Sequence, residues 1–373
     1  MTPQTLPGSR LRLLVAGLMS FVLLGAGQAV MGPALPVYQQ RFGIDTGQAS
    51  WLVSSLGFGS FSGLVGLYFF GHHVTPRRAL LVMSSGAALL ALSPSFLVSV
   101  AGGAVFGLGF GSVAALFNSR ILATFGPRGP SMVSLLNAGY SIGAIAAPLM
   151  FVALGSNPAL VFAAVAVLTA LTVLITDAAA GERSAKVQRG GAGFRFHFPI
   201  LGFGLVAIGI EVSLSGLGPT AMIRAGIAPP QAAALLSAFF LAFLAGRLVL
   251  TLLAERVPSF AVFTLACLST ALCSLGAALI DPAWFFVPMG LCAGLFFPGY
   301  FVTASRKMGD DVRVAPVILA AVQIGAVTGP LIIGRLLPLM GERGFFWLIA
   351  GTALVLGVTA VALYPRMSGE ARG

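Results

Sequence analysis

The stretch IGAIAAPLM at residues 142–150 returns as IGAVTGPLI at residues 324–332, 182 positions further along the chain. The two copies share Ile, Gly, Ala, Pro and Leu at corresponding positions. A shift of 183 residues brings FGLGFG, residues 106–111, to MGLCAG, residues 289–294. These recurring segments predict a chain built from two duplicated halves.

The composition indicates a membrane protein. Of the 373 residues, 58% are hydrophobic and only 8% are charged, whereas soluble globular chains carry roughly a quarter charged residues. Apolar runs of about 20 residues, enough to span a bilayer as a helix, recur along the chain. They are continuous and contain Gly and Pro, which is typical of membrane helices and argues against a barrel. We expect twelve spans at residues 11–38, 49–70, 79–95, 98–120, 129–153, 158–177, 196–222, 231–253, 259–280, 283–305, 313–338 and 344–364.

The longest polar interval, residues 178–195, separates the predicted halves as a cytoplasmic central loop. The sequence therefore predicts an all-α membrane protein with two pseudo-twofold-related six-helix bundles, at residues 1–177 and 196–373. In such a repeat the substrate site lies near the bilayer midplane between bundles that rock against each other. Three pairs of glycines four residues apart predict close helix packing. They are Gly59 and Gly63, Gly139 and Gly143, and Gly325 and Gly329.

The formal net charge of +11 would suggest a nucleic-acid partner in a soluble protein, but here its distribution indicates membrane topology. With twelve spans and an inner N-terminus, 17 of the 21 basic residues fall on the inner side. The four on the outer side are Arg41, Arg224, Arg335 and Arg343. This asymmetry predicts that both termini are cytoplasmic, in a bacterial-type inner membrane, and we expect no nucleic-acid partner.

Twelve spans in a 6+6 repeat with an inner central loop resemble the major facilitator superfamily (MFS) over essentially the whole chain. After span two, that superfamily carries a loop of the form G-x-x-x-D-R-x-G-R-R. This chain has GHHVTPRR at residues 71–78, without the acidic residue and the inner glycine. The matching loop after span eight is AGRLVLTLLAERV, residues 245–257. The resemblance implies a gating role for Gly71, Arg77, Arg78, Gly246, Arg247, Glu255 and Arg256.

Finer resemblances point in two directions. GIEVSLSG in span seven, GRLVLTLL in span eight and FFPGYFVTASRKMG in span ten resemble the fucose:proton symporter-related branch of sugar and metabolite carriers. By contrast, GAVTGPLIIG at residues 325–334 is similar to a motif that drug:proton antiporters carry in span five, although here it lies in span eleven. The first resemblance implies a solute symporter, and the second implies a multidrug or metabolite efflux antiporter.

One carboxylate, Glu211, interrupts the apolar run from Phe198 to Met222, which holds no other charged residue. A charged group at mid-membrane costs several kcal/mol, so intramembrane acids usually mark ion pathways or proton relays. We expect Glu211 to load and release a proton as the bundles rock. Two alternatives remain open: a structural glutamate that ties span seven to span eleven or one, and direct substrate contact without coupling.

Other polar and aromatic residues lie on the spans that would line the cavity in this architecture, namely 1, 2, 4, 5, 7, 8, 10 and 11. Spans 3, 6, 9 and 12 would face lipid. The 183-residue shift lays Gln28 on Glu211, so we expect both in the central cavity. Asn118 and Asn137 could equally link helices. The candidate substrate-binding residues are Gln28, Asn118, Asn137, Tyr140, Gln323, Phe297 and Tyr300.

Other chemistries have little support in the sequence. The three cysteines, Cys267, Cys273 and Cys292, lie in apolar helices without metal-ligand spacing, so we expect buried thiols. There is no Gly-rich phosphate loop with its lysine, and no nucleophile with a suitably spaced base. We expect no enzyme activity, no catalytic residue, no metal and no cofactor. The prediction is a monomeric secondary carrier for a small organic solute, proton-coupled through Glu211; an uncoupled facilitator is a further alternative.

Overall fold

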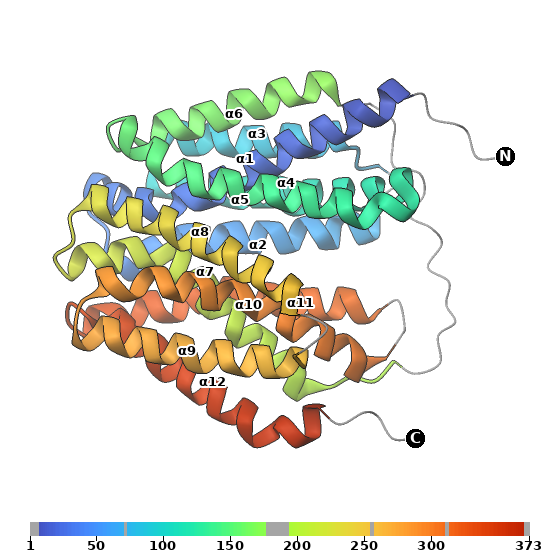
Figure 1. Cartoon of the computed structure of the whole chain (residues 1–373). Coiled ribbons are helices and arrows are strands. Elements are labelled where there is room, and N and C mark those ends of the chain that lie inside the picture. The colour runs from blue at the N-terminus through green and yellow to red at the C-terminus, as the bar shows by residue number, and fades with distance from the viewer. Residues whose placement is uncertain (1–6, 71–72, 177–193, 254–256, 310–312, 369–373) are drawn as a thin grey trace. The chain divides into compact units, whose positions relative to one another are not determined.

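The computed structural model describes residues 7–70, 73–176, 194–253, 257–309 and 313–368. Throughout these residues the regular structure is helical, with twelve long helices and two short 3-10 turns (Figure 1). The long helices are α1 (Pro7–Phe42), α2 (Thr46–Phe70), α3 (Pro76–Leu92), α4 (Phe96–Phe125), α5 (Gly129–Ala153), α6 (Pro158–Ile175), α7 (Phe198–Arg224), α8 (Pro229–Leu253), α9 (Ser259–Leu279), α10 (Pro282–Met308), α11 (Val314–Leu336) and α12 (Gly344–Ser368). Each of the twelve predicted spans corresponds to one of them.

Length and surface character agree with a membrane location. Ten helical stretches in the described residues are long and apolar enough to cross a membrane, and one of them, Phe96–Ala153, contains both α4 and α5. Large apolar side chains are exposed on α6, α9 and α12, for example Leu174 (75%), Leu272 (70%) and Val355 (68%). These helices are among those predicted to face lipid. The chain is an all-helical, multi-pass membrane protein.

The chain divides into two compact units. The first contains Met1–Val37 and Ser55–Lys186, and the second contains Tyr38–Ser54 and Val187–Gly373. The second unit therefore includes the end of α1 and the beginning of α2, although the sequence places them in the first half. The contact is close, since a Cβ added at Gly334 of α11 would lie 2.5 Å from the Cβ of Ser50.

In the first unit, glycines allow helix backbones to approach one another. A Cβ added at Gly143 of α5 would lie only 1.9 Å from the carbonyl oxygen of Val22 in α1. A Cβ added at Gly107 of α4 would lie 2.2 Å from the carbonyl oxygen of Leu56 in α2. Any side chain larger than hydrogen would force these helices apart, as in the small-residue interfaces of other membrane proteins.

The second unit repeats the same contacts. A Cβ at Gly325 of α11 would lie 1.9 Å from the carbonyl oxygen of Leu205 in α7, and one at Gly290 of α10 would lie 2.2 Å from that of Phe239 in α8. Each of these four residues is 182 or 183 positions after its counterpart in the first unit. The duplication seen in the sequence is thus preserved as equivalent helix contacts.

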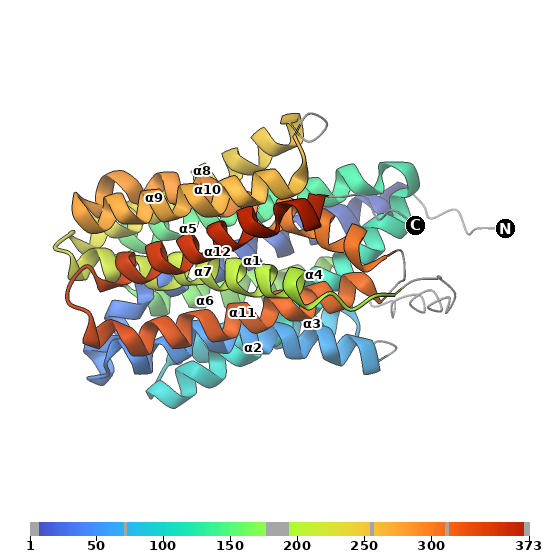
Figure 2. The same ribbon diagram turned by 90° about the horizontal axis from the view of Figure 1, so that it is seen from below.

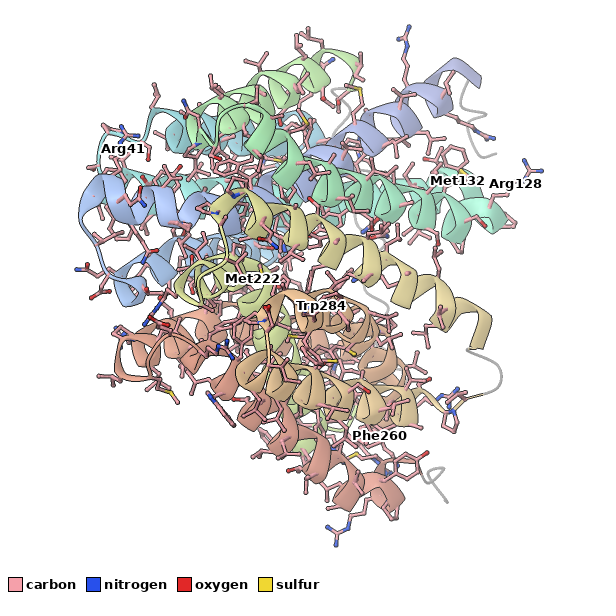
Figure 3. The ribbon with its side chains drawn as sticks, turned by 60° about the vertical axis from the view of Figure 1, so that its left-hand side comes forward. Arg41, Arg128, Met132, Met222, Phe260 and Trp284 are labelled. Atoms are coloured by element: carbon pink, nitrogen blue, oxygen red, sulfur yellow. The ribbon has the colours of Figure 1, made fainter. Side chains whose placement is uncertain are left out.

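The packing of each unit is completed by equivalent helices. In the first unit α3 packs against α4 and α6, and in the second α9 packs against α10 and α12 (Figure 2). Large aromatic side chains fill the second unit, including Phe239 and Phe286, whose ring centroids lie 5.1 Å apart. The 3-10 turn Gly126–Arg128 joins α4 to α5, and exposed Arg128 points away from the helices (Figure 3).

Candidate functional site

Glu211 is the middle residue of α7, with 13 helical residues on either side. The helix begins at a fixed point because the His197 ring nitrogen Nδ1 accepts a hydrogen bond from the Ile200 N–H at 3.3 Å, and Pro199 occupies the first turn. Both features are favourable at a helix N-terminus. The local sequence thereby fixes the start of α7, from which the position of Glu211 along it follows.

The face of α7 that carries Glu211 is directed toward α10. Residues seven apart lie nearly above one another on a helix of 3.6 residues per turn, so Gly204, Glu211 and Gly218 share one face. A Cβ at Gly204 would lie 2.2 Å from the ring of Tyr300, and one at Gly218 would lie 2.6 Å from the ring of Phe286. Because both rings belong to α10, Glu211 lies between two contacts with that helix.

The contact between α7 and α11 uses a different face. A Cβ added at Gly329 of α11 would lie 2.6 Å from the Cα of Gly209. Glu211 is two residues further along α7 and is therefore turned by about 200° from Gly209. Its side chain does not take part in the closest α7–α11 packing, which weakens the alternative that it ties these two helices together.

The carboxylate of Glu211 sits in an environment with little hydrogen bonding. The residue as a whole is partly buried, but its Oε2 atom is fully buried and accepts no hydrogen bond from the described residues. Buried polar atoms normally have partners, and an exception calls for an explanation such as a functional role. Glu211 is thus an ionisable group whose oxygen is shielded from water in this conformation.

The guanidinium of Arg247 on α8 lies within electrostatic range of the Glu211 carboxylate. Its Cζ atom stands 4.4 Å from the ring centroid of Phe243, one turn earlier in α8. The side chain therefore runs back along the helix rather than toward the C-terminal end of α8 at Leu253. The family resemblance implies a gating role for Arg247; in the structure its charge also acts on the carboxylate of Glu211.

This pair of opposite charges belongs to the second unit alone. The equivalent glycine contacts fix an offset of 183 residues for α1 and α7, and also for α2 and α8. At that offset Glu211 corresponds to Gln28, and Arg247 corresponds to Leu64. The first unit thus carries a neutral amide and an apolar side chain where the second carries an acid and a base.

The predicted residues of the first unit lie at different depths. Gly27 of α1 lies against the ring of Phe106 in α4, and Gly17 of α1 lies against the ring of Phe117 in α4. Gln28 is next to Gly27 and so lies at the depth of the first contact, whereas Asn118 is next to Phe117 and so lies at the depth of the second. About twelve residues of α1 separate these levels, which is roughly 18 Å at 1.5 Å per residue. The Asn118 Oδ1 atom is buried and has no hydrogen-bond partner among the described residues.

Two further candidates of the first unit are on α5. The Asn137 side-chain amide donates to the Val133 carbonyl of its own helix at 2.9 Å. The Tyr140 ring packs edge-on against Phe110 of α4, with 6.4 Å between centroids. Part of the hydrogen-bonding capacity of Asn137 is therefore used within α5, while Tyr140 and Gln28 are partly buried.

The remaining candidates of the second unit have different surroundings. Tyr300 is only 1% exposed, its ring fills the space beside Gly204, and its hydroxyl has no partner among the described residues. The partly buried Phe297 packs against Phe301 at 5.3 Å between centroids. Gln323 is partly buried and lies on α11 close to the glycine contact with α7. Tyr300 thus faces the interior of the unit.

Of the predicted gating residues, Gly71, Glu255 and Arg256 lie outside the described part of the chain. The Arg77 Nε atom donates to the Thr176 carbonyl at 2.5 Å, and an Arg78 nitrogen donates to the His73 carbonyl at 2.6 Å. The first bond links the start of α3 to the end of α6. Gly246 packs against the Leu291 carbonyl of α10, where a Cβ would lie 2.5 Å away.

The three cysteines are free thiols, and Cys267 and Cys292 are buried. The described residues contain no group of three His, Cys, Asp or Glu side chains placed to hold a metal ion. Glu211 and Arg247 are thus the charged groups described in the interior of the second unit.

Comparison with known proteins gives a family and a fold. The family model described as Major Facilitator Superfamily matches residues 17–316. A crystal structure of the nucleoside transporter NupG is similar over 95% of this chain and 99% of its own, with 15% identity and a TM-score of 0.75.

Two further solved structures are similar to this chain in fold. A structure of the peptide transporter POT in complex with sulfate matches with 15% identity and a TM-score of 0.76, over 99% of this chain and 96% of its own. A D-xylose-proton symporter matches with 13% identity and a TM-score of 0.73, over 96% and 98%. No curated protein sequence matches this chain.

Proposed function

Since the chain belongs to the major facilitator superfamily and is a secondary transporter of a small-molecule substrate, we propose that it moves a small organic solute by alternating access and that Glu211 couples this movement to protons. Arg247 acts as the counter-charge of Glu211 in this proposal. The observation that carries the proposal is the buried, unpartnered Oε2 atom of Glu211 within electrostatic range of a guanidinium.

The physical argument rests on two opposing effects on the carboxylate. An apolar surrounding favours the neutral acid, whereas a nearby positive charge favours the carboxylate anion. The balance depends on the separation of Glu211 from Arg247 and on water access to Oε2. A movement of α7 relative to α8 changes both, so the proton occupancy of Glu211 would follow the transport cycle.

Alternating access requires contacts that form in one state and separate in another. Ser50 on α2 and Gly334 on α11 come from the two predicted halves of the chain and pack tightly within the second unit. The guanidinium of Arg335 also lies 5.9 Å from the ring centroid of Trp51. We propose that these contacts close one side of the carrier and that they separate when the carrier opens to that side.

The substrate class is narrowed by charge and by similarity. A monovalent pair at Glu211 and Arg247 suits a neutral or zwitterionic solute better than a multiply charged anion, which would need several cations. The similar solved structures are named for transport of nucleosides, peptides and D-xylose. Nucleosides, pentoses and short peptides are therefore the first panel for a thermal-shift screen, because a ligand stabilises the state that it binds.

The test compares Glu211→Gln with wild-type protein in proteoliposomes, using a solute from that screen. The variant is expected to lose accumulation driven by a proton gradient while it still exchanges labelled for unlabelled solute. Glu342→Gln is the matched control, because Glu342 is an exposed acid in the turn before α12. Normal gradient-driven accumulation by Glu211→Gln would remove Glu211 from the coupling role.

The same assays separate the rival functions. Efflux antiport is favoured by the GAVTGPLIIG segment, residues 325–334, and predicts resistance to cationic or hydrophobic compounds when the protein is overproduced. An uncoupled facilitator predicts exchange without any accumulation in the wild type. The proposal further includes cytoplasmic termini in a bacterial-type inner membrane, a monomeric carrier, and kinship with the fucose:proton symporter-related branch.

A further inference from the structure

A long apolar groove runs between α7 and α12 in the second unit, where the two helices lie side by side (Figures 1 and 2). Its volume is about 680 Å³, within the range of roughly 300–1,000 Å³ that is typical of ligand sites. Its lining includes Gly202, Phe203 and Val206 of α7 and Trp347, Gly351 and Leu363 of α12. It is separate from Glu211, which is absent from its lining.

Two glycines widen the groove. Gly202 and Gly351 are both exposed, and a Cβ added at either one would have no atom within 4 Å. This contrasts with Gly325, where a Cβ would lie 1.9 Å from a backbone oxygen. Gly202 and Gly351 are thus not needed for helix packing. They leave space that another molecule can occupy.

The groove offers few hydrogen-bond partners for a polar ligand. Its two threonines donate within their own helix, Thr352 to the Leu348 carbonyl at 2.8 Å and Thr359 to the Val355 carbonyl at 2.7 Å. The rest of the lining is apolar side chain and glycine, apart from the indole N–H of Trp347, which can donate one hydrogen bond. A hydrocarbon occupant fills most of such a surface without leaving polar groups of its own unsatisfied.

The dimensions suit an extended hydrocarbon chain. The lining of α12 runs from Trp347 to Leu363, and at 1.5 Å per residue this stretch extends about 24 Å along the helix. The hydrocarbon core of a bilayer is roughly 30 Å thick. The α12 side of the groove therefore extends over most of the hydrocarbon layer, whereas the α7 side, from Pro199 to Val206, extends over about 10 Å of it.

Two arginines lie near the start of α7 and the end of α12. Arg366 lies one turn after Leu363 on α12, and Arg195 lies four residues before Pro199 of α7. Both arginines are exposed, and the backbone N–H of Arg195 is fixed by a 3.0 Å bond to the Met308 carbonyl.

We propose that the α7–α12 groove binds one acyl chain of an anionic glycerophospholipid, whose phosphate is held by Arg195 and Arg366. The bilayer supplies the hydrocarbon, and the two arginines select a negatively charged head group over a zwitterionic one. Basic residues at a membrane surface attract anionic lipids by about 1 kcal/mol each, so two of them predict a preference of roughly thirtyfold.

The experiment is native mass spectrometry of the detergent-purified full chain incubated with equal amounts of phosphatidylglycerol and phosphatidylcholine. Wild type is expected to retain one phosphatidylglycerol with roughly thirtyfold preference. Gly202→Leu/Gly351→Leu, which fills the groove, should reduce retention at least about tenfold, since most of the buried hydrocarbon contact is lost. Gly66→Leu is the control, because Gly66 on α2 also has open space around it.

A second pair of variants tests the head-group site. Arg195→Gln/Arg366→Gln should bring the ratio of the two lipids close to one, whereas Arg12→Gln, an exposed arginine on α1, should leave it unchanged. Equal retention of both lipids by wild type, or an unchanged ratio in the double arginine variant, would overturn the head-group assignment. Undiminished retention after filling the groove would overturn the site itself. If the double leucine variant does not fold, Gly202→Leu and Gly351→Leu are measured singly.

Discussion

Replacing Gly325 by valine probes the contact on which the equivalence of the two units depends. At this position a Cβ would lie 1.9 Å from the carbonyl oxygen of Leu205. An ordinary contact begins near 3.4 Å, so α11 would have to withdraw from α7 by about 1.5 Å. The two γ-methyl groups of valine add to this displacement. The contact is backbone to backbone, so no side-chain rotation can relieve it.

The size of the effect follows from known costs of overpacking. Extra methyl groups in a tightly packed interior cost about 1–3 kcal/mol, and more where the backbone must move. A cost near 3 kcal/mol lowers the melting temperature by roughly 6–12 °C for a unit of 150–250 residues. Gly66→Val is the matched control, because a Cβ at Gly66 of α2 meets no atom within 4 Å.

The measurement is thermal unfolding of purified protein, followed with a thiol-reactive dye that reports exposure of the native cysteines. Two of them, Cys267 and Cys292, are buried. The control is expected to unfold within about 2 °C of wild type, since a substitution without contacts changes stability by about 0.5 kcal/mol or less. If Gly325→Val unfolds at the same temperature as Gly66→Val, the close approach of α7 and α11 is wrong and the register derived from it fails.

The remaining predictions concern the site and the transport cycle. Arg247→Gln should reduce proton-driven accumulation at least about tenfold, because the counter-charge of Glu211 is lost. Arg247→Lys keeps the charge and should retain more activity than Arg247→Gln. Equal transport by the two variants would show that charge at this position is irrelevant. Ser50 and Gly334 can both be replaced by cysteine in a protein that lacks the native thiols. The two new cysteines should form a disulfide after about 1 Å of relaxation, and the disulfide should stop solute exchange until it is reduced. Exchange at the normal rate with the disulfide formed would show that this contact does not separate during transport. Accumulation by wild type should rise as the pH falls on the side of solute uptake, whereas solute exchange by Glu211→Gln should not change with pH.

The sequence predicted the architecture because membrane helices have a strong signal. Apolar runs of about 20 residues are rarely anything other than membrane-spanning helices. The twelve predicted spans correspond to α1–α12. Helix ends were less accurate: α4 continues to Phe125, beyond the predicted end at residue 120. Hydropathy reports the apolar crossing, whereas a helix continues until its backbone hydrogen bonding is broken or capped.

The site was only partly predictable. Glu211 stood out as a lone acid in an apolar run, and the repeat offset that pairs it with Gln28 is supported by the glycine contacts. The relation of Arg247 to Glu211 was missed, because a long side chain near a helix end can point either way and the sequence favoured the inner surface. The stacking of Arg247 on Phe243 fixes its direction. The presence of Phe243 one turn before Arg247, on the same face of α8, was the feature of the sequence that could have indicated this direction.

Side-chain orientation is a second feature of the site that the sequence could not predict. Tyr300 was predicted to contact substrate because it is aromatic and lies on a predicted cavity helix. Its ring occupies the space left by Gly204 inside the unit, and its contact with substrate stays a prediction. Helical periodicity alone does not say which neighbour a given face meets. The glycine opposite Tyr300 comes from another helix, and its effect becomes visible only when the two helices are packed together.

The central claim is that Glu211 carries the coupled proton, and proton movement tests it most directly. Proteoliposomes containing a trapped pH-sensitive dye are given an identified solute without any imposed gradient. Wild-type protein is predicted to change the internal pH as solute enters, whereas Glu211→Gln is predicted to move solute by exchange with no pH change. A pH change of wild-type size in Glu211→Gln would contradict the account, because the proton would then travel by another group.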